Sequence, residues 1–348
     1  MKMSFNLNTI VRPSIKSLQP YSSARDEFIG KAEVYLDANE NPFGTGLNRY
    51  PDPYQQELKS KISKIKNINK DSIILGNGSD EVIDLLFRAF CEPSKDEVII
   101  LPPTYGMYQV CADINNIKTK KVSLTSDFEV DETSLLETIN ENTKIIWFCS
   151  PNNPTGNTMD PVVIKNILNS FEGIVVIDEA YIDFSDSQSW IDFLEFHPNL
   201  FIIQTLSKAW GLAGLRLGMG FASKEIISIL NKIKPPYNVN SLTQEKAIEA
   251  IGYLDKKNEI IDAILAEKVK LKEKLDQIDG VQQIYQSDAN FILVKINNAT
   301  DIYNKLVEQS IIVRNRSSVT LCEDCLRITV GKPAENEKLL NAIKKITA

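Results

Sequence analysis

The sequence predicts an α/β fold, in which helices sandwich a mostly parallel sheet in a large domain that is followed by a smaller α+β domain. Short runs rich in isoleucine and valine recur between amphipathic stretches, namely "DSIILG", "DEVIIL", "TKIIWFCS", "GIVVIDEA", "NLFIIQTLS" and "GMGFAS". Runs that are apolar throughout are typical of strands buried on both faces, and parallel strands need crossover helices between them. These two observations predict the large domain over residues 31–235.

A change of pattern after "KIKPPYN" predicts the second domain, because Pro235 and Pro236 interrupt any helix. The segment from about Gln244 to Ile278 has the apolar spacing of one or two helices. "NFILVKI", "IIVRN" and "CLRITVG" then follow as strands, and "ENEKLLNAIKKIT" as a final helix. We assign residues 236–348, together with an N-terminal arm of residues 1–30, to this smaller domain.

The composition limits the possible partners. Hydrophobic residues make up 43% of the 348 residues and charged residues 24%, as in an ordinary globular protein. A formal net charge of −7 argues against nucleic acid as a partner, since phosphate backbones require clustered lysine and arginine. The N-terminal residues lack the apolar core of a signal peptide, and no later run is long enough to cross a bilayer. We therefore expect a cytoplasmic protein without membrane partners.

The cysteines and the single histidine argue against metal and hydrolase chemistry. Five cysteines are an odd number and widely spread, so we expect reduced thiols rather than disulfides. Cys322 and Cys325 in "CEDC" have the spacing of a metal or redox site, but zinc needs further ligands and His197 is distant in sequence. No metal is expected. A lone histidine before a proline also argues against a Ser-His-Asp hydrolase.

Reactive groups gather where predicted strands end, which is where open α/β sheets bind ligands. "GNGSDE" leads into a helix whose free N–H groups, with the Ser79 hydroxyl, suit a phosphate, although an ordinary capped helix has the same pattern. "SPNNPTG" holds Asn153 in a rigid turn, which is also the pattern of a plain turn. "DEAY" places Asp178 after an apolar strand, as a functional carboxylate, a helix cap or a metal ligand.

Lys208 follows the strand "LFIIQT" within the small-residue stretch "SKAWGLAGLR". A lysine whose ammonium group is removed from water, or lies near other cations, loses its proton readily. That is the state required of a lysine that forms a Schiff base. Taken alone, the residue could equally be a surface lysine.

The ordered set "NPFG", "GNGSDE", "PPTYGMY", "SPNNPTG", "DEAY", "SKAWGLAGLR" and "LRITVG" resembles the fold-type-I pyridoxal-phosphate-dependent aminotransferases over almost the whole chain. Within that family, the chain is similar to the histidinol-phosphate aminotransferases in "PYSSAR", "YLDANENPFG", "NRYPDP", "PPTYGMY" and the pair Arg314 and Arg327. The resemblance implies the fold-type-I architecture, pyridoxal 5'-phosphate as cofactor, and a homodimer.

The resemblance also implies a role for each matching residue. Lys208 would form the Schiff base with the cofactor and move the proton, and Asp178 would keep the pyridine nitrogen protonated. Asn153 and Tyr181 would donate hydrogen bonds to the phenolic oxygen of the cofactor, and Tyr105 would stack on its ring. The cofactor phosphate would be held by Ser79, Asp80 (through its N–H), Ser207, Arg216 and Tyr50 of the neighbouring subunit.

For the substrates, the resemblance implies that Arg327 grips the carboxylate of glutamate or 2-oxoglutarate. Arg314 and Tyr21 would face the phosphate of histidinol phosphate, with Asn39 lining the pocket; Arg316, two residues on, could share or take this role. The implied reaction converts imidazole-acetol phosphate and L-glutamate to histidinol phosphate and 2-oxoglutarate, in histidine biosynthesis.

Three alternatives remain open at the level of sequence. One is an aromatic-amino-acid aminotransferase of the same subfamily, which needs an apolar pocket beside Tyr21 and Arg314. Another is a decarboxylase of a phosphorylated amino acid. A transcription regulator of the same fold is disfavoured, because the sequence has no helix-turn-helix segment before "EVYLDANENP" and is acidic.

Overall fold

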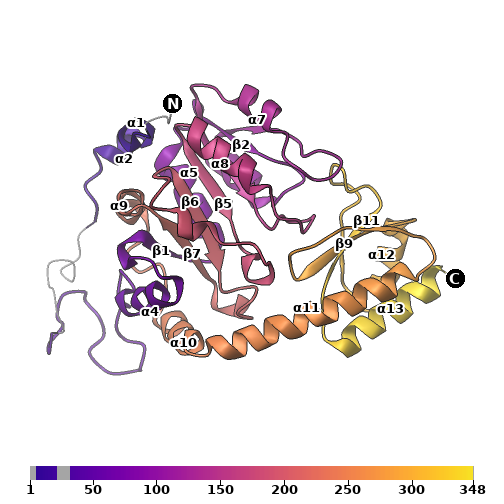
Figure 1. Ribbon diagram of the computed structural model, residues 1–348. Helices are drawn as coiled ribbons and strands as arrows, with labels where there is room; N and C mark the ends of the chain where they lie inside the picture. Colours follow the sequence, from indigo (N-terminus) through magenta and orange to yellow (C-terminus); the bar gives the residue numbers. More distant parts are fainter. Residues whose placement is uncertain (1–4, 22–31, 348) are drawn as a thin grey trace.

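A computed structural model describes residues 5–21 and 32–347, so residues 1–4 and 22–30 of the predicted N-terminal arm lie outside the described residues. A seven-stranded sheet forms the centre of the larger part, in the order β1-β7-β6-β5-β4-β2-β3 (Figure 1). Its strands are β1 Ile73–Asn77, β2 Glu97–Ile100, β3 Lys118–Lys121, β4 Thr143–Cys149, β5 Ile174–Asp178, β6 Leu200–Thr205 and β7 Leu217–Ala222.

The sheet is mostly parallel, as the apolar runs predict. Strands β2 to β6 run parallel to one another, whereas β7 is antiparallel to both β6 and β1. Every residue of β5, β6 and β7 is buried, because helices cover both faces of the sheet. The predicted α/β fold class is therefore confirmed.

One layer of helices covers the first face of the sheet. It contains α5 Ser79–Phe90, α6 Met107–Ile114 and α9 Lys224–Ile233, with the short N-terminal helices α1 Leu7–Ile10 and α2 Pro13–Lys16 beside them. The apolar side of α5 packs against inward-facing residues such as Trp147 and Phe201. This packing fixes the first turn of α5 at the edge of the sheet where the predicted site residues lie.

A second layer covers the other face. It contains α4 Gln56–Lys66, α7 Glu132–Thr138, α8 Pro161–Ser170 and α10 Ser241–Ile251. Ala247 and Ile251 of α10 belong to the same core cluster as Leu58 and Ile62 of α4. Four 3₁₀ turns complete the larger part, at Lys70–Ser72, Ile182–Phe184, Trp190–Phe193 and Ala213–Leu215.

The long helix α11 Leu254–Asp276 leads from the large sheet to the smaller part (Figure 1). There, a four-stranded antiparallel sheet has the order β10-β11-β9-β8. Its elements are β8 Val281–Ile284, β9 Phe291–Ile296, β10 Arg314–Asn315 and β11 Cys325–Thr329, covered by α12 Ala299–Glu308 and α13 Pro333–Thr347. The segment expected as one or two helices is thus two, α10 and α11.

The sequence missed two strands. The β3 sequence "KTKK" has none of the apolar residues that indicate a strand, because β3 lies at the edge of the large sheet. In β8, "VQQI" is equally polar at its centre and also lies at an edge. The domain boundary at residue 236 stays a prediction; α10, which follows that boundary, packs in the core beside α4.

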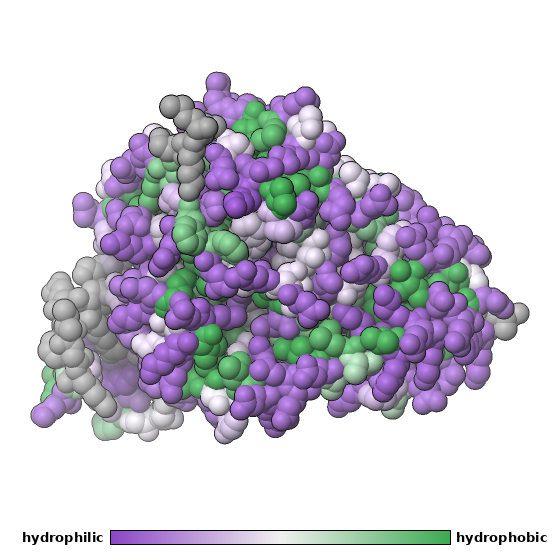
Figure 2. Space-filling model, viewed as in Figure 1, coloured by the Kyte–Doolittle hydropathy of each residue, from purple (hydrophilic) through white to green (hydrophobic). Residues whose placement is uncertain are grey.

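Hydrophilic side chains cover most of the face shown in Figure 2, and hydrophobic ones form small separate patches. Among the described residues, no helix combines the length and apolarity needed to span a membrane.

Candidate active site

The candidate active site lies where three neighbouring parallel strands end. Asn153 follows β4, Asp178 is the last residue of β5, and Lys208 follows β6. The register pairs Cys149 of β4 with Asp178, and Asp178 with Ile203 of β6. The topology therefore brings together three residues that lie up to 55 positions apart in the sequence.

Asp178 is buried, with only 3% of its surface exposed. The hydroxyl of Tyr108 donates to its Oδ2 at 2.7 Å, and the N–H of Ala180 donates to its Oδ1 at 3.0 Å. Burial raises the pKa of Asp178 from 3.8 to about 6, although both hydrogen bonds lower it. A buried carboxylate with only two donors is suited to face a third group that carries a positive charge.

Lys208 remains accessible to solvent beside this carboxylate, with its Nζ 5.6 Å from the ring centroid of Tyr181. The pKa of Lys208 is lowered, first by partial removal of its ammonium group from water and next by the charge of Arg327. Arg216 adds to this effect, and Asp178 and Asp80 oppose it. A lysine in this setting is neutral more often than an isolated one, as a nucleophilic amine must be.

The smaller sheet contributes Arg327 to the same cluster. Its Nη1 donates to Oδ1 of Asn153, and its guanidinium carbon lies 5.3 Å from the ring centroid of Phe291. Burial lowers the pKa of Arg327. Its Nε is buried and makes no hydrogen bond with any residue that the structure describes. Since a buried donor without an acceptor is costly, this atom suits an anionic ligand.

The two other candidate arginines lie next to Arg327. Arg314 is opposite Arg327 in the β10–β11 register and is exposed. Arg316 is half-buried, and its Nε also lacks a hydrogen bond. Burial, then the charges of Arg327 and Arg314, lower the pKa of Arg316 to about 10. Three positive charges therefore converge on the side of the site formed by the smaller sheet.

The first turn of α5 forms an anion cradle with Arg216. The helix begins after Gly78, which has a left-handed φ of 81° and offers no side-chain cap, so the N–H groups of the first turn stay available to a ligand. A Cβ atom on Gly78 would lie 2.6 Å from Nη2 of Arg216. Arg216 itself has a φ of 53°, which turns its chain back toward the helix.

Further polar groups surround this cradle. The hydroxyl of Tyr105 donates to Oδ1 of Asp80 at 3.0 Å, and Oδ2 of Asp80 lies 3.8 Å from Nη2 of Arg216. The Ser207 hydroxyl lies 3.0 Å from Oγ1 of Thr205. An uncapped helix terminus, an arginine and a serine hydroxyl together fit the donor set that a phosphate group needs. The predicted phosphate residues Ser79, Asp80, Ser207 and Arg216 thus lie around one cradle.

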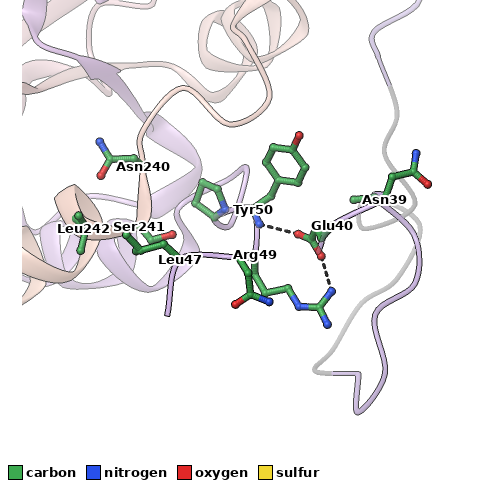
Figure 3. Close-up of a pocket in the computed structure, with 11 residues that line it drawn as sticks. Asn39, Glu40, Leu47, Arg49, Tyr50, Asn240, Ser241 and Leu242 are labelled. Atoms are coloured by element: carbon green, nitrogen blue, oxygen red, sulfur yellow. Dashed lines mark hydrogen bonds and ion pairs between the residues drawn. The ribbon is translucent and has the colours of Figure 1, made fainter. Parts of the chain in front are cut away.

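Three predicted residues lie away from this cluster. Tyr50 and Asn39 line a separate pocket of about 450 Å³ (Figure 3). There, Glu40 accepts hydrogen bonds from the Tyr50 N–H at 2.6 Å and from Nη1 of Arg49 at 2.7 Å, while the Tyr50 ring stacks on Tyr237 at 4.5 Å. Tyr21 is 72% exposed. Within one chain, these three residues do not complete the site.

The carboxylate of Glu179, next to Asp178, is held by hydrogen bonds to other elements of the fold. Its carboxylate accepts from Oγ of Ser189 at 2.6 Å, from the N–H of Trp190 at 2.7 Å and from Nε2 of Gln204 at 2.8 Å. Across residues 5–21 and 32–347, no group of histidine, cysteine and acidic residues could hold a metal ion. Cys322 and Cys325 are buried free thiols.

Tyr108 is the residue of this site that sequence reasoning missed. It stands in the quoted motif "PPTYGMY", but only Tyr105 received a role. A signal was present, because a tyrosine three residues after Tyr105, in the first turn of α6, needs a partner for its hydroxyl when it is buried. That partner, Asp178, is 70 residues away and could not be identified from local pattern.

Comparison with known proteins agrees with this geometry. Residues 30–343 match the family described as aminotransferase class I and II. The chain is 54% identical to the histidinol-phosphate aminotransferase of Christiangramia forsetii, with 98% of each chain covered, and 54% identical to that of Flavobacterium psychrophilum, with 99% of each covered. The solved structure of histidinol-phosphate aminotransferase from Sinorhizobium meliloti in complex with pyridoxal-5'-phosphate shares the fold, with a TM-score of 0.80, 22% identity and 96% of each chain covered. The resemblance found in the motifs is therefore confirmed, and the chain belongs to the class I and II aminotransferases, within the histidinol-phosphate aminotransferase family.

Proposed function

We propose that this protein transfers an amino group between L-histidinol phosphate and 2-oxoglutarate, with pyridoxal 5'-phosphate as cofactor, in histidine biosynthesis. The observation that carries the choice of substrate is the convergence of Arg314, Arg316 and Arg327 near Lys208, with two buried guanidinium Nε atoms that have no acceptor. One substrate has a phosphate and the other has carboxylates, so both need cationic groups in one pocket.

The residues present fit the cofactor. When bound, pyridoxal phosphate supplies an electron-withdrawing ring that stabilises negative charge on the substrate carbon. We assign its phosphate to the first turn of α5 (Ser79 and Asp80), Ser207 and Arg216, and its pyridine nitrogen to the buried carboxylate of Asp178. Asn153 and Tyr181 are assigned to its phenolic oxygen, Tyr105 to its ring face and Lys208 to its aldehyde carbon.

The side chains of the protein account for the proton movements. Lys208, with its lowered pKa, takes a proton at Nζ from the substrate carbon and returns it from the same atom. Arg327 orients glutamate or 2-oxoglutarate by a two-pronged contact to its carboxylate. The hydrogen bond between Arg327 and Asn153 ties this carboxylate site to the cofactor side of the pocket.

An absorbance titration of the yellow protein tests the proposed substrate. L-histidinol phosphate should convert the cofactor band to the amine form at a far lower concentration than L-phenylalanine does. A preference for phenylalanine would replace the proposal with an aromatic-amino-acid aminotransferase. Release of carbon dioxide from a phosphorylated amino acid would instead identify a decarboxylase.

The arginines should contribute unequally to the two substrates. Arg314 belongs to strand β10 and Arg316 follows it, close enough that the charge of Arg314 lowers the pKa of Arg316, so both can approach one phosphate dianion. We expect R314A and R316A each to raise the KM for histidinol phosphate about tenfold, since a charge-assisted hydrogen bond is lost, with little effect on glutamate. R327A should raise the KM for both substrates. Steady-state kinetics with each substrate decides, and a change below twofold would remove that arginine from the phosphate site.

We also propose a homodimer that brings Tyr50 of one subunit to the cofactor phosphate of the other. Four large apolar residues between residues 32 and 50 are exposed, namely Val34 (71%), Leu36 (88%), Phe43 (78%) and Leu47 (60%). Exposed apolar residues gathered in one segment are typical of an interface. Tyr50 and Asn39 belong to this segment and to its pocket.

Light scattering should therefore give twice the mass of one chain. F43D should shift the protein toward monomers and lower its activity, because a charge in an apolar interface is costly. I114D is the matched control, since Ile114 is 73% exposed on α6, outside the proposed interface. A monomeric wild-type protein with full activity would contradict the proposal.

A cytoplasmic location is proposed as well. All five cysteines, each within the described residues, are buried free thiols. Free thiols are usual in a reducing compartment.

A further inference from the structure

Tyr108 is held between the sheet and the cofactor side of the site. Its ring stacks on Trp147 of β4 at 4.8 Å and 18°, and Trp147 stacks in turn on Phe87 of α5 at 5.3 Å. Tyr105, the residue assigned to the cofactor ring, contacts Tyr108 edge-on at 5.6 Å. The side chain of Tyr108 is 0% exposed. This packing leaves its ring one orientation.

In that orientation, the hydroxyl of Tyr108 points at the carboxylate of Asp178. It donates to Oδ2 at 2.7 Å, the usual distance for a hydrogen bond from a hydroxyl to an oxygen. The other oxygen, Oδ1, accepts the Ala180 N–H at 3.0 Å. Tyr108 is therefore the one side chain that donates a hydrogen bond to Asp178 within the described chain.

Other ionisable groups face Asp178 from every neighbouring element. They are Tyr105 and Tyr108 from the α6 region, Cys149 from β4, Asp80 from α5, Tyr181 after β5 and Lys208 after β6. The charge of Asp80 disfavours a negative charge on Asp178, and the charge of Lys208 favours it. Burial is the largest effect and favours the protonated acid, while the Tyr108 hydrogen bond is the largest effect that opposes it.

We propose that Tyr108 is a positioning residue, which keeps the carboxylate of Asp178 ionised and oriented so that it can pair with the protonated pyridine nitrogen of the cofactor. The inference rests on the role proposed above for Asp178. It adds a residue that acts on the cofactor only through another side chain. In Y108F the ring and its stacking remain, and only the donated hydrogen bond is removed.

The first test follows the titration of Asp178 in the cofactor-free protein, by ¹³C NMR of protein labelled at the aspartate carboxyl carbon, with D178N used to assign the signal. In the wild type the pKa should be about 6. In Y108F it should rise by about one unit, because a hydrogen bond to the charged form is lost. Y303F, which removes the hydroxyl of a half-buried tyrosine of the smaller part, should leave the titration unchanged. An unchanged titration in Y108F would overturn the proposal.

The second test measures the affinity of the cofactor-free protein for pyridoxal phosphate, by quenching of tryptophan fluorescence. At pH 5, where a smaller fraction of Asp178 is ionised in Y108F than in the wild type, Y108F should weaken binding about tenfold, and the difference should disappear at pH 9, where the carboxylate is ionised in both proteins. In a D178N background, Y108F should change the affinity less than twofold. Equal weakening in both backgrounds would mean a merely structural role. If D178N alone left the affinity unchanged, the role of Asp178 would fail and this proposal with it.

Discussion

Replacing Lys208 with alanine is expected to lower kcat by at least about 10³-fold. In the roles proposed for Lys208, the variant loses both the amine that attacks the cofactor aldehyde and the base that moves the substrate proton, and base catalysis alone contributes roughly 10²–10⁴-fold. The lowered pKa of Lys208 favours the neutral amine that both roles need. The fold should be retained, because Lys208 is exposed and makes no packing contact that alanine would vacate in the core.

Single-turnover kinetics with histidinol phosphate measures this loss directly. K224A is the matched control, because the Lys224 side chain is 76% exposed, in the first turn of α9. Its activity should equal that of the wild type. A K208A protein that retained a tenth of the activity would show that another group carries the proton, and the assignment of this lysine would be wrong.

Replacing Asp178 with asparagine is expected to lower kcat by about 10³-fold and, at the same time, to stabilise the cofactor-free protein at alkaline pH. The activity falls because, in the role proposed for Asp178, a neutral amide no longer keeps the pyridine nitrogen protonated. The stability rises because the folded protein no longer holds a buried negative charge. These two effects have opposite signs, which a damaged fold could not produce.

The sign of the stability effect follows from the raised pKa. The carboxyl of Asp178 has a pKa of about 6 in the folded chain and an ordinary value of 3.8. The stabilisation of the folded chain by the protonated Asp178 carboxyl is thus fully present below pH 3.8 and is lost as the pH rises through about 6. Above that range the buried charge costs about 2–3 kcal/mol, at 1.36 kcal/mol for each pH unit of difference. D178N should remove that cost at pH 8 and should change the free energy of unfolding little at pH 4.

Urea unfolding of the cofactor-free wild type and D178N at both pH values tests this. D301N is the control, because the Asp301 side chain is 59% exposed and its pair with Lys305 is an exposed one. Such pairs contribute about 0–1 kcal/mol, so D301N should change the free energy of unfolding only slightly at either pH. A D178N protein less stable than the wild type at pH 8 would contradict the argument.

The sequence predicted those parts of the fold that have a continuous apolar signal. All six apolar runs became strands of the large sheet, because strands covered on both faces must be apolar throughout. The edge strand Lys118–Lys121 has one face and one edge in solvent, and its lysines carry no such signal. The predicted strand "IIVRN" is paired only over Arg314–Asn315, because only these two residues contact β11 in register.

The site residues also fall into those that have a local sequence signal and those that do not. Asn153, Asp178 and Lys208 could be predicted, because each follows an apolar strand and strand ends of a parallel sheet meet at one edge. The link between Tyr108 and Asp178 joins a helix to a strand across 70 residues, and only the stacking on Trp147 sets its direction. The positions of Tyr50 and Asn39 relative to the cofactor depend on a second subunit and remain predictions.

The lysine-rich strand β3 has a consequence for how the molecules assemble. An edge strand presents unpaired N–H and C=O groups to which a strand of another chain can add, and lysines on the edge discourage this. In β3, Lys118 and Lys120 lie 3.6 and 2.7 Å from the carboxylate of Glu97, while the Lys118 side chain is still 73% exposed. Two copies of this edge would repel each other at close range. Continuous sheets between molecules, and the aggregation to which they lead, are thereby disfavoured at this edge, and association is left to other faces.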